Sequence, residues 1–225
     1  MKAGPRRMAV ACFGFTNFMF YPNFRQEKKL RRRGYSYIAG IDEAGRGAWA
    51  GPLVAAAVIL DPKIKIRGIK DSKLLRAPER KEIFAQLKEL AIAWAVGLVD
   101  EKLIDEIGLG EANLLAMKKA LAGLNVIPHY FLADGFSPQG LAIPGREIIK
   151  GDYKVTSIAA ASIIAKVTRD QIMDELDENF PQYGFKHHKG YGTAHHHNML
   201  IRYGVSEIHR KSFKPIQTLI EITEE

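Results

Sequence analysis

An apolar run that ends in two adjacent carboxylates constrains the fold of this chain more than any other feature of its sequence. Residues 38–41 are Ile-Ala-Gly-Ile, Asp42 and Glu43 follow them, and residues 45–47 are Gly-Arg-Gly. Acids at the end of a buried strand are typical of a site for a hard divalent cation. Glycines let the backbone approach a ligand closely, and arginine suits a phosphate. The simpler alternative is a strand that ends in a solvated acidic turn, and two further carboxylates downstream argue against it.

The composition is that of a globular protein with a substantial core. The chain has 225 residues, of which 47% are hydrophobic, so one large domain with an appendage can form. Cys12 is the one cysteine, which excludes an internal disulfide framework and fits a reducing compartment. No apolar stretch approaches the roughly 20 residues that a membrane helix needs. We therefore expect a cytoplasmic protein without a membrane attachment.

The net charge of +8 comes from the start of the chain. Residues 1–34 contain nine Lys or Arg and one acid, whereas residues 35–225 contain 24 of each sign. We expect residues 1–34 to form a flexible basic extension, which could add nonspecific affinity for DNA. Residues 180–215 are also basic, with six Lys or Arg against Glu207. This stretch would suit a polyanion, and scattered surface lysines are an equal alternative.

The hydrophobic pattern predicts an α/β sheet domain over residues 35–185 and a helical segment over residues 186–225 that packs on it. The first two strands are separated by a Gly/Pro turn and should pair as a hairpin. The last long helix begins with small residues that allow it to lie flat on the sheet. The expected strands are 35–41, 53–60, 91–99, 130–133 and 147–149, and the expected helices are 78–90, 111–124, 156–180, 193–203 and 215–222.

Four acids stand where these elements begin or end. Asp42 and Glu43 close the first strand, Asp134 closes the fourth strand, and Asp152 precedes the long helix. Sites on open α/β sheets gather at strand ends along one edge. The acids would repel one another there unless cations lay between them, and oxygen ligands select Mg²⁺ or Mn²⁺. Two such ions would suit phosphoryl transfer, although each acid taken singly could be a turn or helix-start residue.

Longer motifs follow one another in a fixed order along the chain. They are Asp-Glu-Ala-Gly-Arg-Gly at 42–47, Asp-Ser-Lys at 71–73, Ala-Asp-Gly at 133–135, Gly-Asp at 151–152, Ala-Ala-Ser-Ile-Ile-Ala-Lys-Val-Thr-Arg-Asp at 160–170, Lys-Gly-Tyr-Gly-Thr at 189–193 and His-Arg-Lys-Ser-Phe at 209–213. In these motifs the chain resembles ribonuclease HII, the type 2 ribonuclease H family. The resemblance runs from about residue 35 to residue 216.

The resemblance implies an RNase H-like fold, in which helices flank a mixed five-stranded sheet and a C-terminal helical segment follows. It implies a metal-dependent endonuclease that cuts on the 5′ side of a ribonucleotide. The substrates would be RNA–DNA hybrids and RNA–DNA junctions, including single ribonucleotides in duplex DNA, and the products would carry 3′-hydroxyl and 5′-phosphate ends. Such an enzyme would act in ribonucleotide excision repair and DNA replication. We expect a monomer, and residues 216–225 show no clear motif for a replication clamp.

The same resemblance assigns roles to residues of this sequence. The catalytic residues, which would also bind two Mg²⁺ or Mn²⁺ ions, are Asp42, Glu43, Asp134 and Asp152. The loop at the scissile ribonucleotide would be Gly45, Arg46 and Gly47. Tyr191 would sense the junction by stacking on the sugar and contacting the 2′-hydroxyl, as discrimination of RNA from DNA requires. The expected phosphate contacts, each of which could equally be a solvated surface charge, are Lys73, Lys166, Arg169 and Lys189.

Three other interpretations stay open. Ribonuclease HIII, a sister enzyme, carries a larger folded N-terminal domain than residues 1–34 could form. A noncatalytic nucleic-acid-binding protein could use the same fold, but paired acids hinder binding of a polyanion unless metal neutralises them. An integrase-like polynucleotidyl transferase would share the sheet and the acids, but not Gly-Arg-Gly with a distant Gly-Tyr-Gly.

Histidines crowd around Tyr191, at positions 187, 188, 195, 196 and 197. They could suggest zinc, but the one cysteine is far away and no histidine stands at clean i, i+4 spacing to an acid. We expect one or two of them to position nucleic acid or a neighbouring carboxylate, and the others to be exposed.

Overall fold

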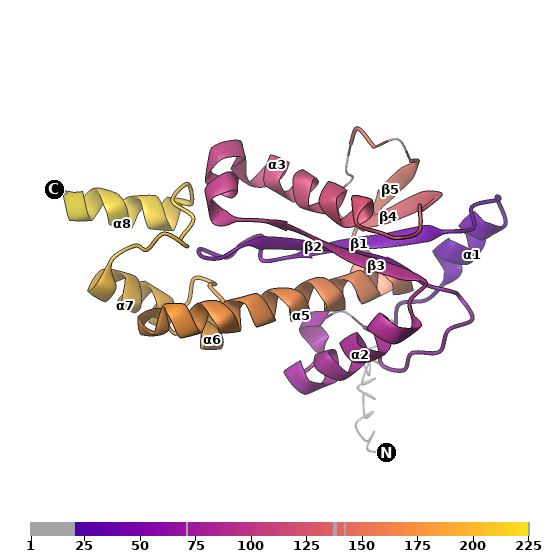
Figure 1. Ribbon diagram of the computed structural model, residues 1–225, viewed down its shortest axis with the longest axis horizontal. Helices are drawn as coiled ribbons and strands as arrows, with labels where there is room; N and C mark the ends of the chain where they lie inside the picture. Colours follow the sequence, from indigo (N-terminus) through magenta and orange to yellow (C-terminus); the bar gives the residue numbers. More distant parts are fainter. Residues whose placement is uncertain (1–20, 71, 137–138, 142, 225) are drawn as a thin grey trace, which may run out of the picture.

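Five strands form one mixed sheet with β1 at its centre (Figure 1). The order is β3-β2-β1-β4-β5, and β1 pairs antiparallel with β2 and parallel with β4. This computed structural model describes residues 21–70, 72–136, 139–141 and 143–224. The mixed five-stranded sheet and the hairpin of the first two strands are confirmed. The strands are β1 Ile38–Ala44, β2 Leu53–Ile59, β3 Ala93–Val99, β4 Tyr130–Asp134 and β5 Gly145–Ile148.

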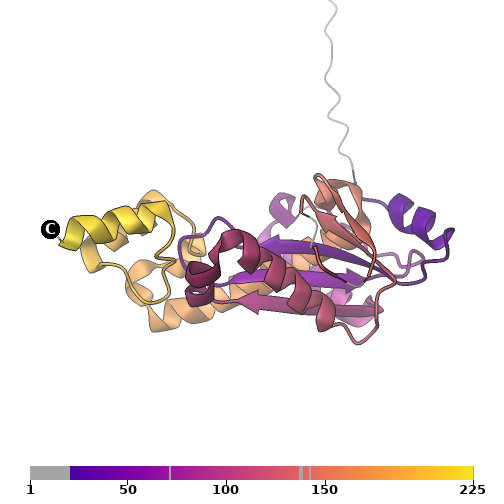
Figure 2. The same ribbon diagram turned by 90° about the horizontal axis from the view of Figure 1, so that it is seen from above.

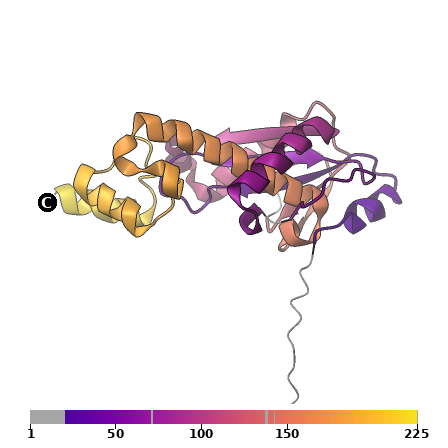
Figure 3. The same ribbon diagram turned by 90° about the horizontal axis from the view of Figure 1, so that it is seen from below.

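Helices cover both faces of the sheet. α3 (Glu101–Ala122) lies on one face, and α2 (Ala77–Leu90) and α5 (Thr156–Asn179) lie on the other (Figures 1, 2 and 3). α5 lies flat on β1, as expected. Gly40 allows this close approach because it has no side chain; a Cβ there would come within 2.1 Å of the carbonyl carbon of Ser157. Within the described residues, none of the helices combines the length and the apolarity that crossing a bilayer requires.

α3 begins ten residues before the helix that the pattern predicts over 111–124. Asp100 caps its start, since the side chain accepts a hydrogen bond from the N–H of Leu103 at 2.8 Å. Gly108 interrupts the helix at φ 79° and ψ 157°, a left-handed φ that glycine adopts without strain. The periodicity is broken at this kink, so the first half of the helix was missed.

The C-terminal segment packs on the far end of α5 around a core of its own (Figure 1). The helices expected over 193–203 and 215–222 are confirmed as α7 (Ala194–Tyr203) and α8 (Lys214–Glu224). Two shorter elements precede them, the 3-10 turn Pro181–Tyr183 and α6 (Phe185–His188). The buried members of this core are Ala50, Met173, Tyr183, Phe185, Leu200, Ile208 and Ile216.

The expected flexible extension over residues 1–34 is wrong for its last part. Residues Arg25–Arg31 form α1, and Leu30 is buried in a core cluster beneath β1 and β4. The buried carboxylate of Glu27 accepts hydrogen bonds from the N–H and the hydroxyl of Ser157, at 3.0 and 2.9 Å. Local charge predicts solvation, but these two contacts tie the helix to the start of α5. Residues 1–20 lie outside the described residues.

Candidate active site

The parallel pairing of β1 with β4 places two of the expected acids side by side. Ile41 of β1 pairs with Ala133 of β4, so Asp42 and Asp134 follow at the same position on adjacent strands. The predicted first strand ended at residue 41, whereas β1 continues to Ala44. Asp42 therefore lies within β1, where it pairs with Ala56 of β2, rather than in a turn.

Asp152 reaches the same place from the short helix α4 (Gly151–Lys154). The N–H of Gly151 donates to Oδ1 of Asp134 at 2.6 Å, which joins α4 to the end of β4. One carboxylate oxygen from each of Asp42, Asp134 and Asp152 lies within 4.8 Å of the others. Three acids that are far apart in the sequence thus form one carboxylate cluster.

The electrostatics of the carboxylate cluster show how closely its charges are crowded. Burial raises the pKa of Asp42 well above its usual value, and the charges of Glu43 and Asp134 raise it further. Burial also raises the pKa of Glu43 to about 7, although the positive charge of Arg46 opposes the shift. The Arg46 guanidinium lies 3.7 Å from Oε1 of Glu43. The protein's own cations therefore neutralise the carboxylates only in part.

The residues at the cluster fit a hard divalent cation. Within the described residues, Oε2 of Glu43 is buried and accepts no hydrogen bond, which is costly unless something else satisfies it. The donors in the cluster are carboxylate oxygens, the ligands that Mg²⁺ and Mn²⁺ prefer. The residues that would hold such ions are Asp42, Glu43, Asp134 and Asp152.

Divalent metal should stabilise the fold through these acids. A cation at 100 times its Kd adds about 2.7 kcal/mol to the free energy of unfolding, or roughly 5–10 °C in Tm for a chain of this size. We expect Mg²⁺ or Mn²⁺ to raise the Tm of the wild type by this amount and to leave the Tm of Asp134→Asn almost unchanged. Differential scanning calorimetry with and without EDTA measures both. Glu106→Gln removes an exposed acid of α3 and should keep the full shift; an equal shift in Asp134→Asn would contradict the site.

A pocket of about 430 Å³ opens beside the carboxylate cluster. Most of the expected substrate contacts line it, although the sequence places them in separate segments. The expected contacts at its wall are Gly45, Arg46, Gly47, Lys73, Lys166 and Tyr191. Lys73 is exposed, and its ammonium lies 3.9 Å from Oδ2 of Asp152. Lys166 lies 5.7 Å from the centre of the Tyr191 ring.

Arg169 is not in the wall of this pocket, and its expected role as a phosphate contact is wrong. The residue is fully buried, and its guanidinium donates hydrogen bonds to the carbonyls of Pro52, Lys189 and Ala50 at 2.8–3.0 Å. Gly45 packs directly on it at φ 90°, where a Cβ would come within 1.9 Å of Nε. Arg169 therefore supports the Gly-Arg-Gly loop from below instead of reaching the solvent.

Lys189 also differs from its expected role. Its ammonium forms an ion pair with Asp174 on α5, and its side chain is 18% exposed. Its backbone lies in the left-handed region at φ 53°, which turns the chain into Gly190 ahead of Tyr191. The residue shapes this turn, and the described lining of the pocket does not include it.

Arg210 is a residue of the site that the sequence did not single out. It is fully buried, and its Nε and Nη2 donate to the carbonyl of Gly51 at 3.0 and 2.9 Å. Its Nη1 donates to the carbonyl of Arg46 at 3.1 Å. The C-terminal segment thus holds the Gly-Arg-Gly loop by its backbone. The motif at 209–213 was the available signal, but nothing in its composition indicates a buried cation.

Trp49 joins the Gly-Arg-Gly loop to the loop that carries Tyr191. The backbone N–H of Trp49 donates to the carbonyl of Gly190 at 2.8 Å, and the backbone carbonyl of Trp49 accepts from the backbone N–H of Arg210 at 2.8 Å. A Cβ on Gly192 would meet the indole ring at 2.2 Å, so the glycine allows this packing. Three segments therefore form one frame around the pocket.

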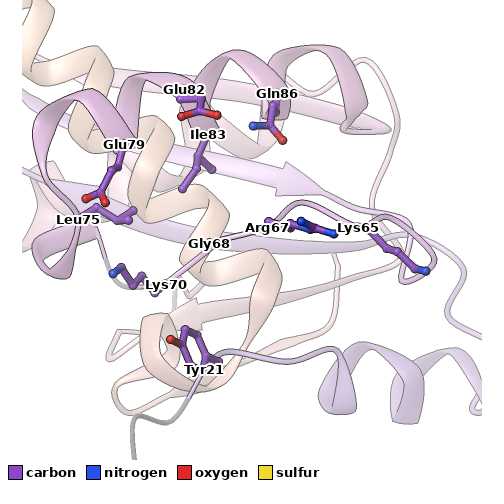
Figure 4. Close-up of a pocket in the computed structure, with 10 residues that line it drawn as sticks. All are labelled: Tyr21, Lys65, Arg67, Gly68, Lys70, Leu75, Glu79, Glu82, Ile83 and Gln86. Carbon is purple, nitrogen blue, oxygen red and sulfur yellow. The ribbon is translucent and has the colours of Figure 1, made fainter.

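A second hollow, of about 500 Å³, lies beside α2 and has different chemistry (Figure 4). Lys65, Arg67 and Lys70 contribute positive charges from the loop after β2, while Glu79 and Glu82 contribute negative charges from α2. Side chains of opposite sign line this hollow, so it does not repeat the arrangement of carboxylates found at the end of β1.

The sheet, with acids gathered on β1, at the end of β4 and on α4, defines an RNase H-like nuclease. Comparisons with known proteins agree. A family model for ribonuclease HII matches residues 39–216. A ribonuclease HII from Desulfitobacterium hafniense (strain DSM 10664 / DCB-2) is 51% identical over 198 residues, which are 88% of this chain and 76% of that relative. The chain belongs to the ribonuclease HII family. It is thus a type 2 ribonuclease H, a divalent-metal-dependent hydrolase that acts as an endonuclease.

Solved structures show the same fold. The ribonuclease H2 from Pyrococcus horikoshii OT3 matches with a TM-score of 0.72 and 29% identity, covering 84% of this chain and 99% of that one. The ribonuclease HII from Archaeoglobus fulgidus, solved in complex with PCNA, matches with a TM-score of 0.67 and 27% identity, covering 79% of this chain and 95% of that one.

Proposed function

We propose that this protein hydrolyses the phosphodiester on the 5′ side of a ribonucleotide in RNA–DNA hybrids and at RNA–DNA junctions. Single ribonucleotides embedded in duplex DNA are included, and the products carry 3′-hydroxyl and 5′-phosphate ends. The observation that carries the proposal is that two acids of the carboxylate cluster, Asp42 and Asp134, line the same pocket as Tyr191. The resemblance to relatives named ribonuclease HII supports it.

The acids of this chain would hold two Mg²⁺ or Mn²⁺ ions. When bound, such ions activate water and stabilise negative charge on the phosphate. Asp42, Asp134 and Asp152 supply oxygens that already lie within 4.8 Å of one another, so little rearrangement is needed to ligate a cation. The unpaired Oε2 of Glu43 supplies a further ligand.

The chain would distinguish RNA from DNA with its backbone and one aromatic ring. Gly45 and Gly47 line the pocket, where peptide groups of this loop can meet a 2′-hydroxyl. The ring of Tyr191 offers a flat face and a hydroxyl. Arg46, Lys73 and Lys166 surround the same pocket with positive charge for the phosphates.

Tyr191→Ala should impair cleavage at a single embedded ribonucleotide more than cleavage of a long hybrid. A lone ribonucleotide offers one 2′-hydroxyl to recognise, and loss of aromatic stacking costs about 1–3 kcal/mol, or roughly five- to 150-fold. The ratio of kcat/KM for the two substrates measures the effect. Tyr191→Phe, which keeps the ring, separates stacking from the hydroxyl contact. Tyr203→Ala on α7 removes an exposed tyrosine as the control. Equal losses on both substrates would argue against junction sensing.

One assay tests the proposed function as a whole. A duplex with a single ribonucleotide is incubated with Mg²⁺, Mn²⁺ or EDTA, and the product ends are mapped. Metal-dependent cuts on the 5′ side of the ribonucleotide are expected. Cleavage of long hybrids alone would favour the specificity of ribonuclease HIII, and binding without cleavage would favour a noncatalytic nucleic-acid-binding protein.

The proposed setting is ribonucleotide excision repair and DNA replication, with the protein acting as a monomer. A replication clamp is a proposed partner, because the Archaeoglobus fulgidus relative was solved with PCNA. Analytical ultracentrifugation of the protein alone and with a clamp from the same organism tests both points. A stable dimer would contradict the proposed monomer, and the absence of a complex with the clamp would contradict the proposed partner.

A further inference from the structure

Three histidines are buried together behind the loop of Tyr191. His188, His196 and His209 are at most 8% exposed. For the histidines around Tyr191, among them His188 and His196, the expectation was contact with nucleic acid or a carboxylate for one or two and exposure for the others. The rings of His188 and His196 are stacked with centroids 4.4 Å apart, and those of His196 and His209 lie 5.3 Å apart. The residues come from α6, α7 and the segment before α8, so sequence spacing did not reveal the cluster.

His209 and His196 form a hydrogen-bonded relay between Ser206 and Tyr191. The hydrogen-bond partners assign one tautomer to each of these two histidines. The N–H of Ser206 donates to Nδ1 of His209 at 3.0 Å, so His209 carries its proton on Nε2. That Nε2 lies 3.1 Å from Nε2 of His196, which must accept. His196 therefore carries its proton on Nδ1, which lies 3.1 Å from the carbonyl oxygen of Tyr191. One arrangement of protons satisfies all three contacts.

The relay needs both of its histidines neutral. A second proton on His196 would leave two N–H groups facing each other between His196 and His209, and a second proton on His209 would set its Nδ1–H against the N–H of Ser206. Burial lowers the pKa of His196 to about 3 and the pKa of His209 to about 4, which keeps both rings neutral at neutral pH. The relay is thus a fixed, directional chain of hydrogen bonds rather than a set of exchanging contacts.

The relay ends at the pocket. Its last acceptor is the main chain of Tyr191, whose ring lines the pocket. The Trp49 indole, which packs on Gly192, lies 5.6 Å from the His196 ring. His196 therefore contacts the backbone of Tyr191 directly, and His209 acts on it through His196.

We propose that His196 and His209 are positioning residues that fix the backbone of Tyr191, so that its ring faces the ribonucleotide. This inference rests on the proposed role of Tyr191 in junction recognition. The histidines touch no substrate; they act through the carbonyl of Tyr191. Loss of the relay should therefore reduce selectivity for a single ribonucleotide more than it reduces cleavage as such.

The test compares substitutions along α7. His196→Leu removes the whole relay, and His196→Asn keeps a donor near the position of Nδ1. His195→Leu and His197→Leu remove exposed neighbours on the same helix as matched controls. The kcat/KM ratio for a single embedded ribonucleotide over a long hybrid should fall about fivefold in His196→Leu, recover in part in His196→Asn, and stay unchanged in the controls. Equal losses on both substrates in His196→Leu would mean that the histidine is merely structural and would overturn the proposal.

A second measurement does not depend on cleavage. ¹⁵N spectra of the substrate-free protein should show His196 protonated on Nδ1 and His209 on Nε2. In His196→Leu the amides of residues 190–192 should shift and exchange faster with solvent, and in His195→Leu they should not. Unchanged amides in His196→Leu would refute positioning even if cleavage falls. A third outcome would separate the two proposals. If the amides change in His196→Leu but the wild type shows no preference for the single ribonucleotide, positioning is supported and the proposed role of Tyr191 is refuted.

Discussion

Asp134→Asn should reduce kcat/KM for cleavage of an RNA–DNA hybrid about 10³-fold or more. Asn has nearly the same shape and retains an oxygen that can accept the hydrogen bond from Gly151, so the fold should persist. It removes one of the charges that would hold divalent cations, and such an electrostatic contribution to the transition state is worth about 4 kcal/mol. Single-turnover cleavage at saturating Mg²⁺ measures the loss at the chemical step.

Glu106→Gln serves as the control for Asp134→Asn because it removes an exposed acid far from the carboxylate cluster in the sequence. Its activity should match the wild type. Circular dichroism of both variants confirms that the fold is retained. Activity of Asp134→Asn within tenfold of the wild type would count against the assignment of the active site.

Arg210→Met should lower the free energy of unfolding by about 3 kcal/mol. The guanidinium makes three hydrogen bonds to the carbonyls of Gly51 and Arg46, and both acceptors would lose their donor. Methionine fills much of the volume, so the cost is mainly that of unpaired carbonyls rather than of a cavity. The Gly-Arg-Gly loop would also lose its link to the C-terminal segment, so cleavage should fall. Urea unfolding at neutral pH measures the change in stability.

Arg202→Met is the matched control, because Arg202 is an exposed arginine of α7. Substitutions of this kind usually change stability by no more than about 0.5 kcal/mol. A loss below about 1 kcal/mol in Arg210→Met, or one equal to that of Arg202→Met, would show that the buried guanidinium does not support the loop.

The carboxylate cluster was predictable because strand pairing obeys simple geometry. An acid after the apolar run of β1 and another after that of β4 lie at the same edge of the sheet if the two strands are parallel neighbours. Asp42 and Asp134 follow this rule directly. The long helix α5 was equally predictable, since its alanines match the close approach that Gly40 permits.

The frame behind the site was not predictable, because burial of a polar side chain depends on partners in distant segments. Arg169 and Arg210 look like surface cations in sequence, yet their acceptors are backbone carbonyls that only the folded chain brings together. His196 gains its partners from Tyr191 and His209 in the same way. The sequence predicts a flexible extension where α1 forms, because basic residues dominate the local charge and nothing in it indicates that Glu27 is buried.

The most direct test of the whole account is anomalous diffraction from crystals of the wild-type protein grown with Mn²⁺. We expect manganese peaks between the carboxylates of Asp42, Asp134 and Asp152, with Glu43 as a further ligand, and no such peaks in Asp134→Asn crystals. Well-ordered wild-type crystals with no manganese at these acids, or with manganese bound only elsewhere, would contradict the central claim that they form a metal-dependent nuclease site.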